Sequence, residues 1–472
     1  MTHSITRRAA VAPRALALIA VLALPLGGCD THKILEVTDP DILTPGSISG
    51  PDALPTVRRA ALGEFALAYG GSGADGSGGT EGVIMYSGLL GDEWINSETF
   101  PTRIEIDRRN TQITNGTMGN WFRTLSRARV RTEFAARGYE DFSPDLTAET
   151  GYAEMLALAG FTYLFFAENW CSGIPFSRAN PDGSTTFGQP LTMAQMLDTA
   201  LARLGAALTA ATNAGDADLA DLARVGQGRA RLDQGNFTAA ATAVAAVPTG
   251  FAYLVTYSLN SARQNNGVVN ANSFNERYSV ADVEAGVGLP YRSAGDPRLS
   301  FVRTGGGTDV GFDRATPQWD QLRYLGRDAS IPLASGLEAR LIEAEAAMNT
   351  GGLGASNTYL PFLNAVRSAP PAYITANGLA IPVMADLTDP GTPAARQDQL
   401  FRERAFWLWL TGHRLSDMRR LLRQYSRAEN TVFPTGPYFK QNLQYDGTDV
   451  NLPVPFDEEN NPNFTQCADR LP

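Results

Sequence analysis

Apolar residues recur every three or four positions along much of this chain, which predicts a protein built mainly of α-helices. In the clearest case, after Thr192, leucines and one alanine follow at steps of four, three, four and three. Thr192 and Gln195 match the capping-box pattern and predict that a helix begins there. Residues 151–170 are apolar on most faces and predict a central helix buried all round.

The same spacing predicts further helices, with breaks at glycine or asparagine between them. In chain order they lie at residues 52–69, 121–137, 218–234, 237–246, 337–348, 359–366 and 401–422. Small residues at Gly228, Gly235 and Ala240 would let two antiparallel helices approach closely, which resembles a tetratricopeptide helix pair. The last helix is expected to be the longest. Three glutamates, Glu338, Glu343 and Glu345, are expected to form a solvated helix face.

Two long stretches depart from the helical pattern. Residues 251–331 are rich in Gly, Asn, Asp and aromatic residues, which predicts a long loop-rich insertion. Long loops on a rigid scaffold commonly carry binding residues. The chain from residue 430 onward is rich in proline, and we expect it to be irregular.

The N-terminus carries the features of an export signal. Three arginines precede an apolar run at residues 15–26, which is too short to span a bilayer comfortably. The sequence Leu26-Gly27-Gly28-Cys29 then resembles a bacterial lipobox, which implies cleavage before Cys29 and attachment of lipid to its thiol. The alternatives are an ordinary secretory signal with a coincidental cysteine and a cysteine of the core.

These observations divide the chain into a signal, an anchor and a body. We expect a lipoprotein signal peptide at 1–28, a lipidated extended tether at 29–50 and a single helical domain at 51–472, whose last helix and Pro-rich tail occupy 395–472. No other stretch approaches 18 consecutive apolar residues, so we expect no membrane-spanning helix in the mature protein.

Charge and composition exclude some partners. The chain is 43% hydrophobic and 19% charged, as a folded protein should be, and its net charge is −10. Removal of the signal, with three arginines and no acid, would leave about −13. An acidic protein is poorly suited to bind nucleic acid. It is equally unsuited to adsorb on anionic lipid without a covalent anchor.

Two cysteines remain once Cys29 is lipidated. An even number in an oxidising compartment predicts a disulfide between Cys171 and Cys467, which would attach the C-terminal tail to the body. The alternative is a pair of buried free thiols. The chain has only three histidines, and His3 and His32 lie in or beside the signal. We therefore expect no metal site and no cofactor.

Several segments together resemble the RagB/SusD-like outer-membrane nutrient-binding lipoproteins. Residues 35–40, followed by residues 55–67, resemble the family's first segment and first helix. Residues 161–176 (FTYLFFAENWCSGIPF) resemble its aromatic helix and G-x-P turn. Asp296-Pro-Arg-Leu299 resembles a recurrent motif. The most specific matches are residues 399–420 (QLFRERAFWLWLTGHRLSDMRR) and the ending at 452–463. The likeness covers nearly the whole mature chain.

The resemblance implies a mainly α fold of tetratricopeptide-like helix pairs, a SusD-like α-α superhelix, with a loop-rich ligand-binding region packed on it. It also implies a non-catalytic lipoprotein of the outer membrane that faces the cell exterior. Such a protein would capture oligosaccharide or peptide and deliver it to a SusC-like TonB-dependent transporter.

Sugar binding predicts a particular set of side chains. Aromatic faces stack on the apolar faces of sugar rings, while Arg, Asn and Asp bind hydroxyl groups. The candidates outside predicted helices are Trp94, Tyr291, Arg292, Trp319, Arg323 and Tyr324. Three further tryptophans, Trp170, Trp407 and Trp409, lie on predicted helices and are expected to pack in the core.

Two other classes of function remain open, a surface glycoside hydrolase and a helical-repeat scaffold or adhesin. The chain lacks G-x-S-x-G and H-E-x-x-H motifs, which disfavours an enzyme. Asp92 and Glu93 could act as an acid–base pair, but adjacent residues point in different directions, so packing and hydrogen bonding are expected instead. We expect the charged residues around His413 to brace the last helix.

Overall fold

The computed structural model describes residues 50–73, 81–180, 184–303, 309–440, 442–465, 467 and 470. The expected signal peptide, Cys29 and all of the expected tether except residue 50 lie outside the described residues. Within the described part of the chain, no helix is both long enough and apolar enough to cross a membrane.

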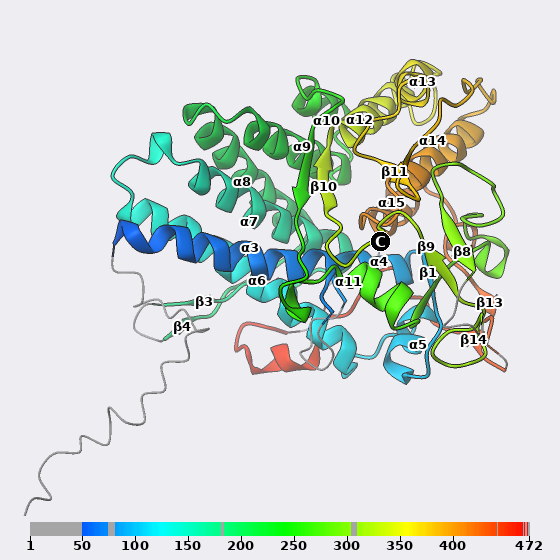
Figure 1. The fold of residues 1–472 in the computed structure, drawn as a ribbon, viewed down its shortest axis with the longest axis horizontal. Coiled ribbons are helices and arrows are strands. Elements are labelled where there is room, and N and C mark those ends of the chain that lie inside the picture. The colour runs from blue at the N-terminus through cyan, green and yellow to red at the C-terminus, as the bar shows by residue number, and fades with distance from the viewer. Residues whose placement is uncertain are drawn as a thin grey trace, which may run out of the picture.

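Helices form most of the described structure (Figure 1). The helices are α3 (Leu54–Gly70), α4 (Val83–Leu90), α5 (Pro101–Asp107), α6 (Gly116–Phe142), α7 (Thr150–Asn169), α8 (Met193–Asn213), α9 (Ala217–Asp233), α10 (Phe237–Val244), α11 (Gly267–Val269), α12 (Gly336–Met348), α13 (Leu360–Ser368), α14 (Pro393–Trp407) and α15 (Arg414–Arg423). Single helical turns are η2 (Pro51–Ala53), η3 (Leu146–Ala148), η4 (Ala262–Gln264), η5 (Asn270–Phe274), η6 (Glu284–Gly286), η7 (Glu429–Thr431) and η8 (Phe456–Asn460).

The strands are short and pair only in antiparallel twos within the described residues. The pairs are β1 (Trp94–Asn96) with β7 (Tyr278–Val280), β2 (Ile174–Pro175) with β5 (Pro190–Leu191), β3 (Arg178–Ala179) with β4 (Thr185–Thr186), β6 (Ala252–Val255) with β10 (Ile331–Ser335), β8 (Phe301–Arg303) with β9 (Trp319–Gln321), β11 (Thr375–Ala376) with β12 (Leu379–Ala380), and β13 (Gly436–Pro437) with β14 (Gln444–Tyr445). The mainly α class predicted from the sequence is confirmed.

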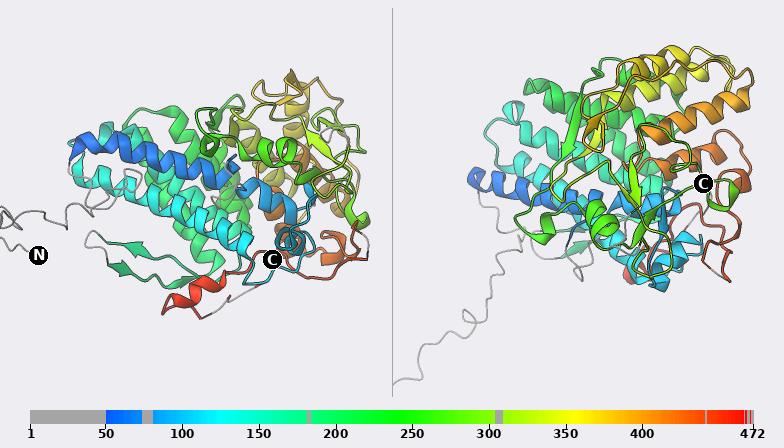
Figure 2. Two further views of the ribbon diagram at one scale, coloured as in Figure 1. Left: turned by 60° about the horizontal axis from the view of Figure 1, so that its bottom comes forward. Right: turned by 45° about the vertical axis from the view of Figure 1, so that its right-hand side comes forward.

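The helices pack as successive neighbours along the chain. Helix α3 lies on α6, α6 on α7, α7 on α8, α8 on α9, and α9 on α10, after which α12 packs on both α10 and α13 (Figures 1 and 2). This arrangement is the expected superhelix of helix pairs. Strands β8 and β9 of the insertion and the C-terminal strands β13 and β14 lie on the right in Figure 1, away from α8 and the other helix pairs on the left.

Helix α7 is the centre of the core, as its sequence predicts. Every residue from Ala153 to Asn169 is buried, because α6 and α8 cover the helix on two sides. The helix α8 begins as predicted: the amide of Gln195 donates to Oγ1 of Thr192 at 3.2 Å, and the amide of Thr192 donates to Oε1 of Gln195 at 2.9 Å. Both bonds of the capping box are present.

The predicted last helix is wrong in one respect, because the structure divides it into α14 and α15. Between them the backbone of Leu410 and Gly412 has positive φ, at 56° and 76°. The amide of Leu410 donates to Oε1 of Glu93, and its carbonyl accepts from the hydroxyl of Tyr324. Among the described residues, the longest helix is instead α6, with 27 residues. The apolar spacing of the sequence continues through residues 408–412, but the chain forms a buried turn there, and hydrogen bonds from other segments stabilise that turn.

The prediction that Glu338, Glu343 and Glu345 form a solvated face is also wrong. Glu338 and Glu345 are 1% and 0% exposed. Both charges have cationic or imidazole partners from the C-terminal helices: Nε2 of His413 lies 3.0 Å from Glu338, and Arg420 pairs with Glu345. Glu345 therefore joins α12 to α14 and α15 through ion pairs with Arg404 and Arg420, and Glu338 adds a contact with the imidazole of His413.

The insertion is loop-rich, as predicted from residues 251–331. It contributes short strands and single helical turns from β6 to β9.

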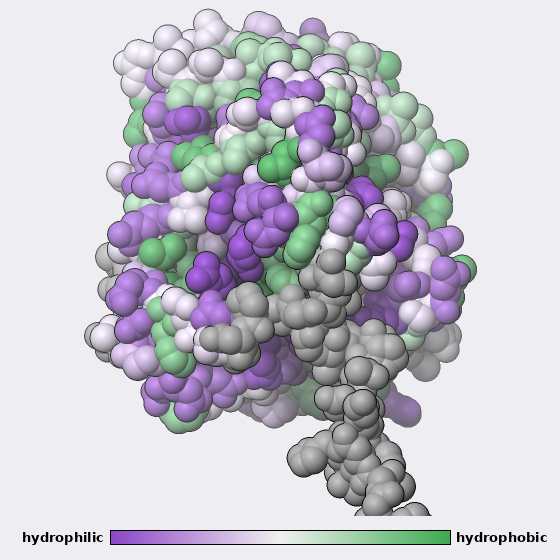
Figure 3. All heavy atoms as spheres, turned by 90° about the vertical axis from the view of Figure 1, so that its left-hand side faces the viewer, coloured by the Kyte–Doolittle hydropathy of each residue, from purple (hydrophilic) through white to green (hydrophobic). Residues whose placement is uncertain are grey.

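Figure 2 shows the β3–β4 hairpin beside the C-terminal segment. Just after this hairpin, the carbonyls of Phe187 and Gly188 accept from Nδ2 of Asn463. On the face at the helix-pair end, hydrophobic residues are interspersed among hydrophilic ones (Figure 3).

Candidate ligand-binding site

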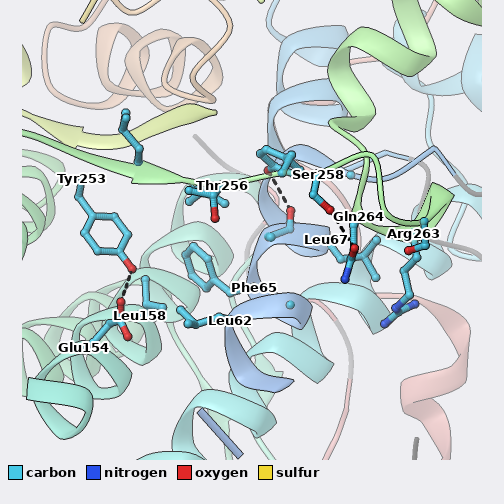
Figure 4. A pocket seen from close by; sticks show the side chains of 17 residues that line it. Leu62, Phe65, Leu67, Glu154, Leu158, Tyr253, Thr256, Ser258, Arg263 and Gln264 are labelled. Carbon is cyan, nitrogen blue, oxygen red and sulfur yellow. Dashed lines mark hydrogen bonds between the residues drawn. The ribbon is translucent and has the colours of Figure 1, made fainter. Parts of the chain in front are cut away.

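A pocket of about 530 Å³ lies between the first helices and the first strand of the insertion (Figure 4). Helix α3 supplies residues 62–67, α7 supplies Glu154 and Leu158, and β6 with its following loop supplies residues 253–264. Ligand pockets usually measure about 300–1,000 Å³. The cavity therefore has room for a small molecule or part of an oligomer.

Apolar side chains form the inner wall of this pocket. Phe65 and Leu158 belong to the core, and the half-buried Leu62 lies beside them (Figure 4). The strand side adds the rings of Tyr253 and Tyr257, both half-buried. A ligand would thus meet aliphatic and aromatic surface on two sides.

A buried carboxylate fixes one end of the pocket. Glu154 is 6% exposed and accepts from Nε of Arg58 at 2.6 Å and from the hydroxyl of Tyr253 at 2.8 Å. Burial and the adjacent Glu154 raise the pKa of Tyr253 well above its usual value, so this hydroxyl remains a donor. These bonds hold the Tyr253 ring in place at the pocket wall.

The opposite end carries polar groups from the loop. The hydroxyl of Ser258 donates to Oε1 of Gln264 at 2.9 Å, and the hydroxyl of Tyr257 donates to the carbonyl of Ala66 at 3.1 Å (Figure 4). Thr256 is exposed, and its hydroxyl points toward the cavity in Figure 4. The guanidinium of Arg263 pairs with Glu64 at the rim.

Hydroxyl and amide groups opposite aromatic and aliphatic surface suit a ligand with one apolar face and many hydroxyl groups. A sugar ring has this character. Within the described residues, no group of three or more His, Cys, Asp or Glu side chains is placed to hold a metal ion.

None of the binding residues predicted from the sequence lines this pocket, although the sequence contains one local signal for it. Phe251, Tyr253, Val255 and Tyr257 alternate with other residues, which is the period of a strand. The alternation could have predicted β6 and placed both tyrosines on one face. The helix residues of the pocket give no such signal, because they continue an ordinary apolar helix face.

Four of the six predicted ligand-binding residues are buried in the structure. Trp94 and Tyr291 are 0% exposed, while Tyr324 and Arg323 are 5% and 8% exposed. Tyr291 packs beside Trp409, and Nη1 of Arg323 donates to the carbonyl of Trp407. Segments distant in sequence cover these side chains, so they have almost no surface left for a ligand. Trp170, Trp407 and Trp409 are core residues, as predicted.

The two other candidates, Arg292 and Trp319, lie together at the surface of the insertion. Both are half-buried, and the guanidinium carbon of Arg292 lies 4.8 Å from the centre of the Trp319 ring. They are not among the residues that line the pocket between α3 and β6. The pair of Arg292 and Trp319 is therefore separate from that pocket.

Cys171 and Cys467 form a disulfide in the structure, with their Cα atoms 5.8 Å apart. The tail reaches Cys171 beside a short parallel contact: the amide of Cys171 donates to the carbonyl of Leu452, and the amide of Leu452 donates to that of Asn169. The tail is thus held against the end of α7.

The acidic and histidine residues considered for catalysis are packed inside the protein. Oε1 of Glu93 accepts from the amide of Leu410, and Asp92 is 2% exposed. Burial and the neighbouring Arg229 lower the pKa of His413, so its imidazole is neutral at pH 7. Nη1 of Arg229 lies 2.9 Å from that ring and its other nitrogens pair with Glu168. As predicted, these groups brace the helices.

Comparison with solved structures identifies the fold. The chain is similar to a SusD superfamily protein from Bacteroides vulgatus, with 15% identity, 89% of this chain and 99% of that chain covered, and a TM-score of 0.58. It is equally similar to surface glycan-binding protein A from Bacteroides thetaiotaomicron in complex with laminarihexaose, with 12% identity, 89% and 100% coverage, and a TM-score of 0.60. A laminarin-binding SusD-like protein is 14% identical over 89% and 99%, with a TM-score of 0.57.

A scan against models of known protein families finds no match, and no curated protein matches the sequence. The solved structures nevertheless span nearly the whole described chain. The fold is that of the SusD-like proteins, which confirms at the level of the fold the resemblance seen in the sequence.

Proposed function

We propose that this protein is a non-catalytic, surface-exposed nutrient-binding lipoprotein that captures oligosaccharide. The observation that carries the proposal is the SusD-like fold over 89% of the chain, shared with a laminarin-binding protein and with a glycan-binding protein in complex with laminarihexaose. Membership of the RagB/SusD-like family, lipid attachment at Cys29 and location at the outer membrane belong to the same proposal.

The pocket between α3 and β6 is the proposed place of capture. Its apolar wall would stack against the less polar face of a sugar ring, while Thr256 and Gln264 would bind hydroxyl groups. Glu154 is already bonded to Arg58 and Tyr253, so it orients the wall and does not act as a general acid.

Delivery completes the proposed function. A lipid anchor at Cys29 would keep the binding protein beside a SusC-like TonB-dependent transporter, into which the captured oligosaccharide passes. Anchoring by acyl chains needs no spanning helix.

A pocket-filling substitution tests capture directly. Thr256→Trp would fill the cavity from an exposed position and is expected to weaken laminarihexaose binding at least about tenfold in calorimetry. Thr388→Trp places the same side chain at an exposed position outside the pocket and serves as the matched control. If neither variant differs from the wild type while the wild type binds, the ligand lies elsewhere.

Delivery is tested separately by purification from membranes in mild detergent. We expect a large β-barrel transporter to co-purify with the full-length chain, and a Cys29→Ser variant to be released from the membrane. A wild-type protein that carries no lipid, or that purifies without a barrel protein, would contradict this half of the proposal.

A further inference from the structure

Trp319 lies at the centre of a cluster that the pocket does not explain. It is on β9, directly opposite Arg303 of β8. The guanidinium carbons of Arg292 and Arg303 lie 4.8 Å and 5.7 Å from the centre of the indole ring. The ring of Phe301 meets the indole edge-on at 5.6 Å. One aromatic side chain therefore has two cations beside it.

Neither arginine forms an ion pair with a carboxylate among the described residues. By contrast, Arg298 of the same insertion pairs with both Asp296 and Glu403. Nε of Arg292 is buried and has no hydrogen-bond partner in the described structure. Arg303 is exposed.

The nearby acids are already engaged. Oδ1 of Asp282 accepts from the amides of Arg292 and Ser293 and from the Ser293 hydroxyl, while Oε2 of Glu284 accepts from the hydroxyl of Tyr445. Burial lowers the pKa of Arg292, although both acids act in the opposite direction. The guanidinium remains charged at neutral pH. Asp282 and Glu284 thus partly balance the charge of Arg292, whereas the exposed Arg303 has no carboxylate partner among the described residues and would attract an anion.

We propose that Arg292, Trp319 and Arg303 bind an acidic sugar unit, so that this protein captures fragments of a uronic-acid polysaccharide. Arginine binds carboxylate in a bidentate fork, with donors that a neutral sugar does not require. The exposed part of the indole offers apolar surface to the sugar ring at the same time. This inference rests on the proposed glycan capture and names the chemical class of the glycan.

The test compares an acidic with a neutral oligosaccharide on the mature full-length chain. Calorimetry would measure binding of oligogalacturonate and of laminarihexaose to the wild type and to Arg303→Gln, Arg292→Gln and Trp319→Ala. Arg314→Gln removes an exposed arginine of the same insertion and is the matched control for charge. Thermal denaturation checks that each variant is folded, and the exposed Arg303 is the substitution least able to disturb folding.

We expect the wild type to prefer oligogalacturonate, and Arg303→Gln and Arg292→Gln each to weaken that binding about tenfold, with Arg314→Gln within about twofold. Added salt should weaken the acidic ligand selectively. Absence of oligogalacturonate binding, or equal binding by Arg303→Gln and Arg314→Gln, would overturn the inference. If laminarihexaose still binds in that case, the proposed glycan capture is not contradicted. The pocket variant Thr256→Trp tests that capture independently.

Discussion

The hydroxyl of Tyr253 donates to Oε1 of Glu154 at 2.8 Å, and this bond joins the first strand of the insertion to the central helix α7. The same carboxylate accepts from Arg58 of α3. Three elements distant in sequence therefore meet at one buried group beside the pocket. The shape of the pocket depends on that junction.

Substitutions of Tyr253 should separate its two roles. Tyr253→Phe keeps the ring but leaves Glu154 with Arg58 alone, so the free energy of unfolding should fall by about 1 kcal/mol while glycan affinity changes little. Tyr253→Ala also removes the ring and should weaken glycan binding about tenfold. Urea denaturation and calorimetry measure the two effects. Tyr152→Phe, which removes a similar bond to Glu140 at the surface, should cost less stability. Equal losses of affinity in both Tyr253 variants would contradict this division.

The turn between α14 and α15 requires glycine. Gly412 has a φ of 76°, and a Cβ there would lie 3.1 Å from Cγ1 of Val83. Gly412→Ala should therefore lower the free energy of unfolding by about 1–2 kcal/mol. Gly205→Ala, in the interior of α8 with open space around it, should instead raise that free energy by roughly 0.5–1 kcal/mol. Thermal denaturation measures both, and a harmless Gly412→Ala would show that the turn tolerates a side chain.

The bond between Cys171 and Cys467 should contribute strongly to stability, because it joins residues 296 positions apart in the sequence. Removing a native disulfide typically costs about 2–5 kcal/mol. We expect the double variant Cys171→Ala, Cys467→Ala to unfold at lower temperature, as should the wild type under reducing conditions. Reducing agent should have no effect on the double variant. Two free thiols in the oxidised mature protein would contradict the prediction.

Glu93 should make stability depend on pH. Burial raises its pKa to about 7, against the opposing bond from the amide of Leu410. Between its ordinary pKa near 4.5 and 7, the folded state retains a proton that the unfolded state has lost. The free energy of unfolding should therefore decline as pH rises through this window and level off above it.

Urea denaturation at about pH 5 and about pH 8 measures this dependence. The free energy of unfolding should decline less between the two pH values for Glu93→Gln than for the wild type. For Glu459→Gln, a substitution at an exposed position, it should decline as in the wild type. Parallel curves for all three proteins would show that Glu93 has an ordinary pKa in the folded state.

The helices were predictable because their signals are local. The capping box at Thr192 and Gln195 lies within four residues, and the apolar spacing that follows it needs no knowledge of the rest of the chain. The same reasoning failed at Leu410, where partners from Glu93 and Tyr324 stabilise a turn. Those partners come from segments far away in sequence, so no local pattern reveals them.

The candidate binding residues were harder to predict for the same reason. Aromatic residues in loops were expected to face solvent, yet Tyr291 and Tyr324 are covered by the segment around Leu408–Leu410 and its neighbours. Arg292 and Trp319 have the same kind of sequence context and remain half-buried. Whether an aromatic residue in an insertion is covered depends on tertiary packing.

A covalent link between α7 and the tail also changes what a protease can do. Most of the chain lies between Cys171 and Cys467, so a single cut in any loop of that region would leave two fragments still joined through sulfur. Only cleavage followed by reduction would let the pieces separate.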